Sequence, residues 1–203
     1  MNRKIKALGL ALMAALALTA VMASAASAQF TSTSKHTNLT GGQVTTHKFT
    51  AGTGIGAITC TTATFNGTAA SESETTQVVT PSYAGCKDSL GRTVHVSVGT
   101  SRYEFTSGAG KGLVHIIGGP IVLTVTGSTH CTITITSQTG NNNVAYAQKG
   151  NNLEVTTTTN NIHSHIAGGG FACGTSNTTS STGSYTGATI MEGNAGATKI
   201  SVH

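Results

Sequence analysis

The chain is poor in charged and in aromatic residues. Only 8% of its 203 residues are charged, it has no tryptophan and two prolines, and the aromatic residues make up 4%. An average soluble domain carries about a quarter charged residues. This composition disfavours a helix-rich enzyme and a coiled coil. Threonine, with 38 residues, and glycine, with 26, are abundant instead.

The N-terminus has the three-part pattern of a secretory signal peptide. A basic start precedes an apolar run over residues 7–22, and an A-x-A site ends at Ala28. A membrane anchor, the alternative, needs about 20 apolar residues and no cleavage site. The sequence therefore predicts a signal peptide over residues 1–28. The protein is expected to be secreted or associated with the cell envelope, with no integral membrane segment after cleavage.

Removal of this segment leaves a nearly neutral protein. The 175 residues after Ala28 contain eight Lys or Arg and six Asp or Glu, a net charge near +2. The basic residues are scattered singly along the chain, whereas binding to nucleic-acid phosphates needs several of them on one face. No nucleic-acid partner is expected.

All four cysteines, Cys60, Cys86, Cys131 and Cys173, follow the predicted cleavage site. In an exported chain they indicate two disulfides, for which three connectivities are possible. The absence of a C-x-x-C motif disfavours a redox site or a zinc ribbon. We favour the pairs that are neighbours in sequence, Cys60–Cys86 and Cys131–Cys173, each of which would contribute about 3.5–4 kcal/mol in the loop-entropy model.

Apolar and polar residues alternate along much of the chain, and helical patterns are nearly absent after residue 28. Strand patterns occur at residues 93–98, 121–126, 131–136, 153–156 and 200–202. Asn/Gly pairs between such runs predict turns, among them 66–67, 140–143, 150–152 and 160–161.

These patterns predict an all-β fold, either an antiparallel β-sandwich or a barrel-like single domain, stapled by two disulfides. We expect the domain to span residues 41–203 and to follow a loose polar arm over residues 29–40. Residues 131–166 are expected to form a meander of four strands.

Conventional hydrolytic chemistry has few residues available. The chain has no G-x-S-x-G elbow, and Asp88 is its only aspartate. Most glycosidases need two facing carboxylates. Glu72 and Glu74 are close in sequence, but their Ser/Thr-rich surroundings favour a solvated loop. The sequence therefore predicts no catalytic residue, no cofactor and no enzymatic activity.

Histidine is the residue type that points to a possible metal site. In a strand, His163 and His165 lie on the same side, which is the geometry of two imidazole ligands. A third ligand would have to come from His130 or His95. The alternative is a set of exposed or hydrogen-bonded histidines without a metal.

Threonine rows and aromatic residues suggest two other surfaces. Thr132, Thr134 and Thr136 form one short row of hydroxyl groups, as ice-binding surfaces do in longer arrays, but regular stacking of several rows is missing and ordinary strand surface is the favoured interpretation. Phe49, Phe65 and Phe105 lie in strand-like runs and are expected in the core. Tyr146 and Tyr185 are candidates to line a ligand surface.

Several short motifs resemble a family of small secreted proteins of high-GC soil actinobacteria that occurs in many copies per genome and has no assigned activity. The motifs are residues 60–67 (CTTATFNG), 80–86 (TPSYAGC), 103–105 (YEF), 131–136 (CTITIT) and 185–187 (YTG). The resemblance implies a secreted β domain and supplies no function.

That family often carries two more cysteines, at the positions that correspond to Ser101 and Gly118. Their joint absence here implies that they form a third disulfide in the family, which supports the pairing favoured above.

Taken together, the sequence predicts a secreted or cell-envelope structural or binding protein of unknown ligand. Weak adhesion to a surface, such as a cell-wall or extracellular polysaccharide, is its most concrete form. A metal-binding protein or metal-dependent enzyme that uses the histidines is the alternative, and an ice-binding protein is the third possibility.

Overall fold

Every regular element in the described part of the chain is a β-strand, as predicted. The structure is a computed structural model that describes residues 28–52, 56–108, 111–127, 131–139, 141–168, 173 and 177–203. The strands are β1 (Phe30–Ser32), β2 (Thr37–Thr50), β3 (Ala57–Cys60), β4 (Thr62–Ala69), β5 (Ser73–Glu74), β6 (Thr76–Ala84), β7 (Cys86–Lys87), β8 (Thr93–Ser97), β9 (Arg102–Thr106), β10 (Lys111–Gly112), β11 (Val114–Ile117), β12 (Ile121–Val125), β13 (Cys131–Ile135), β14 (Gln138–Thr139), β15 (Asn141–Lys149), β16 (Asn152–Gly168), β17 (Thr178–Gly193) and β18 (Ile200–Val202).

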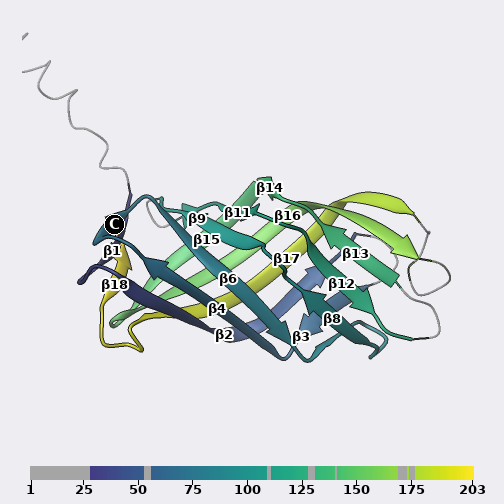
Figure 1. Ribbon diagram of the computed structural model, residues 1–203, viewed down its shortest axis with the longest axis horizontal. Coiled ribbons are helices and arrows are strands. Elements are labelled where there is room, and N and C mark those ends of the chain that lie inside the picture. Colours follow the sequence, from purple (N-terminus) through teal and green to yellow (C-terminus); the bar gives the residue numbers. More distant parts are fainter. Residues whose placement is uncertain are drawn as a thin grey trace, which may run out of the picture.

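The main sheet closes into an antiparallel barrel (Figure 1). Eight strands form the ring in the order β2, β3, β7, β8, β12, β13, β16 and β17, and the ring closes because β17 pairs with both β16 and β2. The sheet continues beyond this ring on both sides. From β2 it runs on through β4, β6, β9, β11 and β14, and from β16 it runs on through β15 and β10. These strands lengthen the barrel. Of the two predicted architectures, the barrel is the one that forms.

Strands that are neighbours in the sheet end or carry a bulge at adjacent positions. We call the band that these positions form around the barrel its waist. The interruptions fall at residues 43–46, 61, 85, 98–101, 118–120, 136–137 and 160–162. A bulge, in which one strand has an extra residue relative to its partner, bends the strand and increases its twist. The waist therefore divides the barrel into two segments that share the long strands β2, β16 and β17.

The waist also keeps apolar side chains inside the barrel. Along β16, alternate residues from Leu153 to Thr159 are buried, and after the bulge at Asn160 and Asn161 burial resumes at Ile162. If the alternation ran through Asn161 without a bulge, Ile162 and Ile166 would face outward, because the bulge places two successive residues, Asn160 and Asn161, on the outside.

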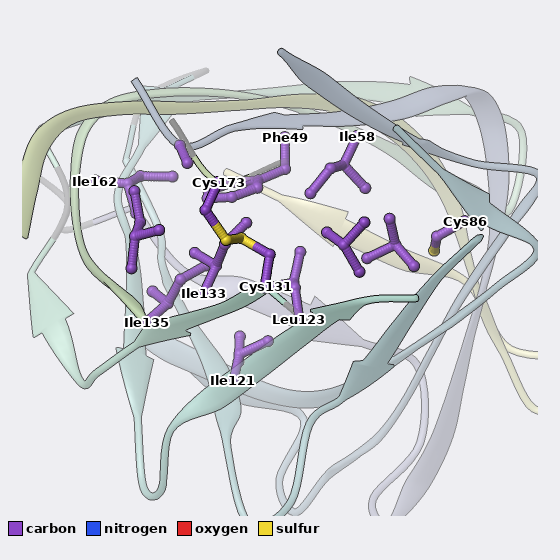
Figure 2. Packing of buried hydrophobic residues seen from close by; sticks show 14 of the residues in the cluster. Phe49, Ile58, Cys86, Ile121, Leu123, Cys131, Ile133, Ile135, Ile162 and Cys173 are labelled. Atoms are coloured by element: carbon purple, nitrogen blue, oxygen red, sulfur yellow. A yellow bond between two sulfur atoms is a disulfide. The ribbon is translucent and has the colours of Figure 1, made fainter. Parts of the chain in front are cut away.

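Each segment of the barrel has its own hydrophobic core. One contains Phe49, Leu123 and Ile133 around the Cys131–Cys173 disulfide (Figure 2). The other contains Leu39, Phe65, Val79, Leu153 and Met191. Full burial of one such side chain is worth about 1.5–3 kcal/mol. Two tyrosines, Tyr83 and Tyr103, pack against both cores and mark the boundary between them.

Both disulfides have the predicted connectivity. Cys60–Cys86 joins the adjacent strands β3 and β7, and Cys131–Cys173 ties residue 173 to the start of β13.

Ser101 and Gly118, the positions at which the sequence comparison leads us to expect a cysteine pair in similar proteins, are neighbours. A β-carbon built on Gly118 would lie 3.5 Å from the α-carbon of Ser101.

A small second sheet, in the order β18, β1 and β5, lies at one end of the barrel (Figure 1). The backbones of Gln29 and His203 exchange two hydrogen bonds of 2.9 and 3.1 Å, and Phe30 packs edge-on against Tyr146 at 5.4 Å. The expected loose arm over residues 29–40 is therefore part of the fold. The polar composition of this segment concealed the strand pairing and the anchoring aromatic ring.

The expected turns are only partly correct. Gly150 lies in the hairpin turn between β15 and β16, as predicted. Asn160 and Asn161 form a bulge inside β16, and Asn66-Gly67 lies within β4. Residues 131–166 do contain four strands, but only β15 and β16 form a hairpin, since β13 pairs with β12 and β16, and β14 pairs with β11. Asn160 and Asn161 thus mark an irregularity within a strand, whereas Asn66-Gly67 pairs regularly with β2 and β6.

Candidate functional site

The barrel encloses a cavity of about 130 Å³. Its wall is mostly apolar and draws on both cores, with Leu39 and Val79 from one and Ile58 and Leu123 from the other. An engineered apolar protein cavity of about 150 Å³ binds benzene. The interior is therefore large enough for a compact organic molecule.

Several inward-facing side chains keep part of their surface uncovered because they border this cavity. Val96, Tyr103, Phe105 and Ile116 line it and are only half-buried. The interior of a small barrel is normally filled by side chains at close-packed density. Here the filling is incomplete at the boundary between the two cores.

Four polar side chains meet inside the barrel and form what we call the tyrosine–histidine chain. The hydroxyl of Tyr83 lies 2.9 Å from that of Tyr103 and 3.0 Å from that of Tyr185. The Tyr185 hydroxyl in turn forms a short hydrogen bond with Nδ1 of His47. All four residues line the cavity. They come from β2, β6, β9 and β17, so the closed barrel is needed to bring them together.

The imidazole of His47 fits inside because β17 carries a glycine opposite it. A β-carbon on Gly187 would lie 2.5 Å from Nδ1 of His47 and 2.7 Å from two ring carbons. Real β-carbons do not approach other atoms this closely. The glycine therefore provides the space in which His47 reaches Tyr185.

Burial keeps all four side chains of the tyrosine–histidine chain uncharged at neutral pH. It lowers the pKa of His47 below the ordinary 6.5, against a smaller opposing effect of the hydrogen bond with the Ala188 carbonyl. It raises the pKa of Tyr103 to about 12. Burial, with the neighbouring Tyr103, raises the pKa of Tyr83 and of Tyr185 well above 10.

The described residues that line the cavity include no Asp, Glu, Lys or Arg. The buried Gln77 amide is held by the wall itself, because its Nε2 donates to the carbonyls of Thr68 and Val78 at 3.1 and 3.2 Å. An unpaired charge in such surroundings would cost many kcal/mol. The cavity is therefore suited to a neutral molecule.

The histidines predicted as metal ligands lie outside the barrel. His163 and His165 are both exposed on the same outer face of β16, as the strand geometry predicts. His95 is exposed on β8, which is separated from β16 by β12 and β13 and thus by about 14 Å at the usual strand spacing. His130 lies outside the described residues. Among the residues described, no three His, Cys, Asp or Glu side chains are close enough to hold a metal ion.

The threonine row lies on the outer face of β13. Thr132 and Thr134 are half-buried, and their cross-strand neighbours on β16 are Ala167 and His165. Other threonines point inward: Thr157, Thr159 and Thr189 line the cavity. The threonine content is therefore not explained by solvated strand faces alone.

The carboxylates examined in the sequence have structural roles. Oε1 of Glu74 accepts hydrogen bonds from the backbone of Ala70 and Ser71 at 2.7 and 2.9 Å. Asp88 accepts from the backbone of Arg92 at 2.9 Å and forms an ion pair with its guanidinium at 2.5 Å. Both carboxylates close turns, and the side chain of Asp88 is itself buried.

Sequence reasoning found part of this site. Tyr146 and Tyr185, the candidates for a ligand surface, both line the cavity. His47, Tyr83 and Tyr103 were not singled out. The sequence does contain one signal that His47 faces the interior. His47 lies two residues before Phe49, which is predicted in the core, and side chains two apart in a strand share a face. No signal in the sequence indicated that the hydroxyls would meet.

No helix among the described residues is long and apolar enough to cross a membrane. Comparisons with family models, with curated proteins and with solved structures gave no match to this chain.

Proposed function

We propose that the protein is an exported binding protein, without catalytic activity, that holds a compact, neutral and mainly apolar molecule inside its barrel. The observation that carries this proposal is the cavity of about 130 Å³ at the boundary between the two cores. A molecule of about six to ten non-hydrogen atoms matches this volume.

Export is supported by the signal-peptide pattern and by the two disulfides, which persist in oxidising compartments. The absence of catalysis is supported by the chemistry of the wall. Among the described residues that line the cavity, His47 is the one group that titrates near neutral pH, and both its nitrogens already have partners. Adhesion to a polysaccharide would have to use the outer face, since a chain of sugars does not fit in this volume.

The test is to fill the cavity from one wall. Val96 faces inward on β8 and borders the cavity, whereas its neighbour Ser97 is exposed. Val96→Phe should abolish binding of toluene, and Ser97→Phe, the matched control, should retain it. Binding is measured on residues 29–203 by calorimetry and by the rise in Tm, with Kd expected between about 10 µM and 1 mM for so small a ligand.

Saturable binding of toluene that is lost in Val96→Phe and kept in Ser97→Phe supports the proposal. Absence of binding by the wild type, or equal binding by Val96→Phe, overturns it. Circular dichroism of both variants checks that the barrel is intact.

A further inference from the structure

The tyrosine–histidine chain has two ends that differ in their partners. At one end, the Tyr103 hydroxyl lines the cavity and has one partner among the described residues, the hydroxyl of Tyr83. A phenolic hydroxyl can both donate and accept. The Tyr103 hydroxyl can therefore form one further hydrogen bond, to a group in the cavity.

At the other end, Nε2 of His47 lies 3.3 Å from the carbonyl oxygen of Ala188 and 3.3 Å from the hydroxyl of Thr189. The carbonyl can only accept a hydrogen bond, whereas the hydroxyl can donate one. The same nitrogen thus has a partner whether or not it carries the proton.

In the first arrangement, Nε2 carries the proton and donates to Ala188. Nδ1 then accepts from Tyr185, whose oxygen accepts from Tyr83, whose oxygen accepts from Tyr103. Every hydroxyl donates toward His47. The oxygen of Tyr103 is left to accept a hydrogen bond from a ligand.

In the second arrangement, Nδ1 carries the proton and donates to Tyr185, and the order of donation reverses along the chain. Nε2 then accepts from the hydroxyl of Thr189. Tyr103 now donates into the cavity. The two arrangements hold the same number of protons: the imidazole gives one proton from Nε2 to water and takes one up from water at Nδ1, and three hydroxyls rotate with their own protons.

We propose that the tyrosine–histidine chain is a reversible hydrogen-bond relay, through which Tyr103 binds either a ligand that donates a hydrogen bond or one that accepts it. This inference rests on the proposed function and specifies its ligands as apolar molecules with one hydroxyl or one carbonyl group. Thr189 is the positioning residue for carbonyl ligands, since only the second arrangement needs its hydroxyl.

The experiment compares two isosteric pairs of probes. Phenol is compared with toluene, and cyclohexanone with methylenecyclohexane. Wild-type protein should bind each polar probe about fivefold to tenfold more tightly than its apolar isostere, the usual worth of one hydrogen bond. Thr189→Val should lose this preference for cyclohexanone and keep it for phenol.

Two further variants separate the relay from general effects on the cavity. Tyr103→Phe should lose both preferences and still bind toluene. Tyr146→Phe is the matched control, because Tyr146 also lines the cavity but donates to the Thr106 carbonyl at 2.8 Å. It should keep both preferences.

Nitrogen-15 spectra of the His47 ring give a second readout that does not depend on affinity. Pyrrole, whose N–H can only donate, should favour the tautomer protonated at Nε2, and cyclohexanone, which can only accept, the tautomer protonated at Nδ1. If Thr189→Val does not fold, the tautomers of the wild type still decide the question.

The outcomes for the two proposals are distinct. Binding of toluene with no preference for polar probes, or one and the same His47 tautomer with pyrrole and with cyclohexanone, overturns the relay and leaves the proposed function intact. Failure of all four probes to bind overturns both.

Discussion

At the scale of single residues, the interior of this barrel depends on where side chains are small. Gly187 makes room for the ring of His47. In the same way, a β-carbon on Gly41 would lie only 2.4 Å from the sulfur of Met191. Both glycines lie in strands, where the residue normally weakens the fold. Their value here is the space that they leave for larger neighbours.

We expect Gly187→Ala to destabilise the protein by about 1–3 kcal/mol, since overpacking of a full interior costs that much. The added methyl group also displaces His47 from Tyr185. Denaturant unfolding followed by circular dichroism measures the change. Gly42→Ala is the matched control, because a β-carbon on Gly42 meets nothing within 4 Å. A Gly187→Ala protein as stable as wild type would contradict the packing described here.

How well the sequence predicts individual residues depends on the kind of contact. The disulfide partners were predictable because short loops favour neighbouring cysteines. The core role of Phe49 and Phe65 followed from alternation. The meeting of Tyr83, Tyr103 and Tyr185 did not, because it depends on the tilt and stagger of strands around a closed ring.

At the scale of elements, the bulge in β16 decides which side chains face the cavity. Asn161 adopts a φ of 59°, in the left-handed region where Asn is tolerated better than most residues. Thr157 and Thr159 lie inside before it, and Ile162 and Ile166 lie inside after it. Strand patterns at residues 121–126 and 131–136 were predictable because they contain no such interruption.

Insertion of one glycine after Asn161 should therefore be far more damaging than any substitution there. It shifts the second half of β16 by one residue relative to the first and turns the side chains of Ile162 and Ile166 outward. We expect no cooperative unfolding transition in the insertion variant. Asn161→Gly, which suits the same φ, should change stability by no more than about 0.5 kcal/mol. A cooperative transition near that of the wild type in the insertion variant would show that the bulge does not set the register.

At the scale of the whole molecule, the closed barrel carries a buried imidazole in its interior, and this links stability to pH. Burial lowers the pKa of His47 below 6.5 in the folded protein. The unfolded chain therefore takes up a proton at this residue at a higher pH than the folded one does. The contribution of neutral His47 is complete above pH 6.5 and is lost as the pH falls from 6.5 toward the lower folded-state pKa.

The free energy of unfolding of the wild type should accordingly fall between pH 7.5 and 5. His47→Gln should lack the part of this fall that comes from His47. His163→Gln, on the exposed outer face, should keep it. Urea titrations at several pH values measure the slopes, and equal slopes for the wild type and His47→Gln would exclude this linkage.

The all-β class was predictable from alternation alone, but the choice between sandwich and barrel was not. Alternation reports that one face of each strand is buried and does not report which strands are neighbours. Here the deciding contact is between β2 and β17, where Leu39 faces Gly193 and Thr50 faces Ser184.

That contact also has a consequence for the order of folding. Pairings between distant parts of a chain form slowly, because a long loop has to close first. In a chain that emerges from its N-terminus, the hairpin of β2 and β3 can form early, whereas the far edge of β2 stays unpaired until β17 arrives. We therefore expect ring closure to come late in assembly. Until it occurs, the open edge of β2 is the place where a second copy would add.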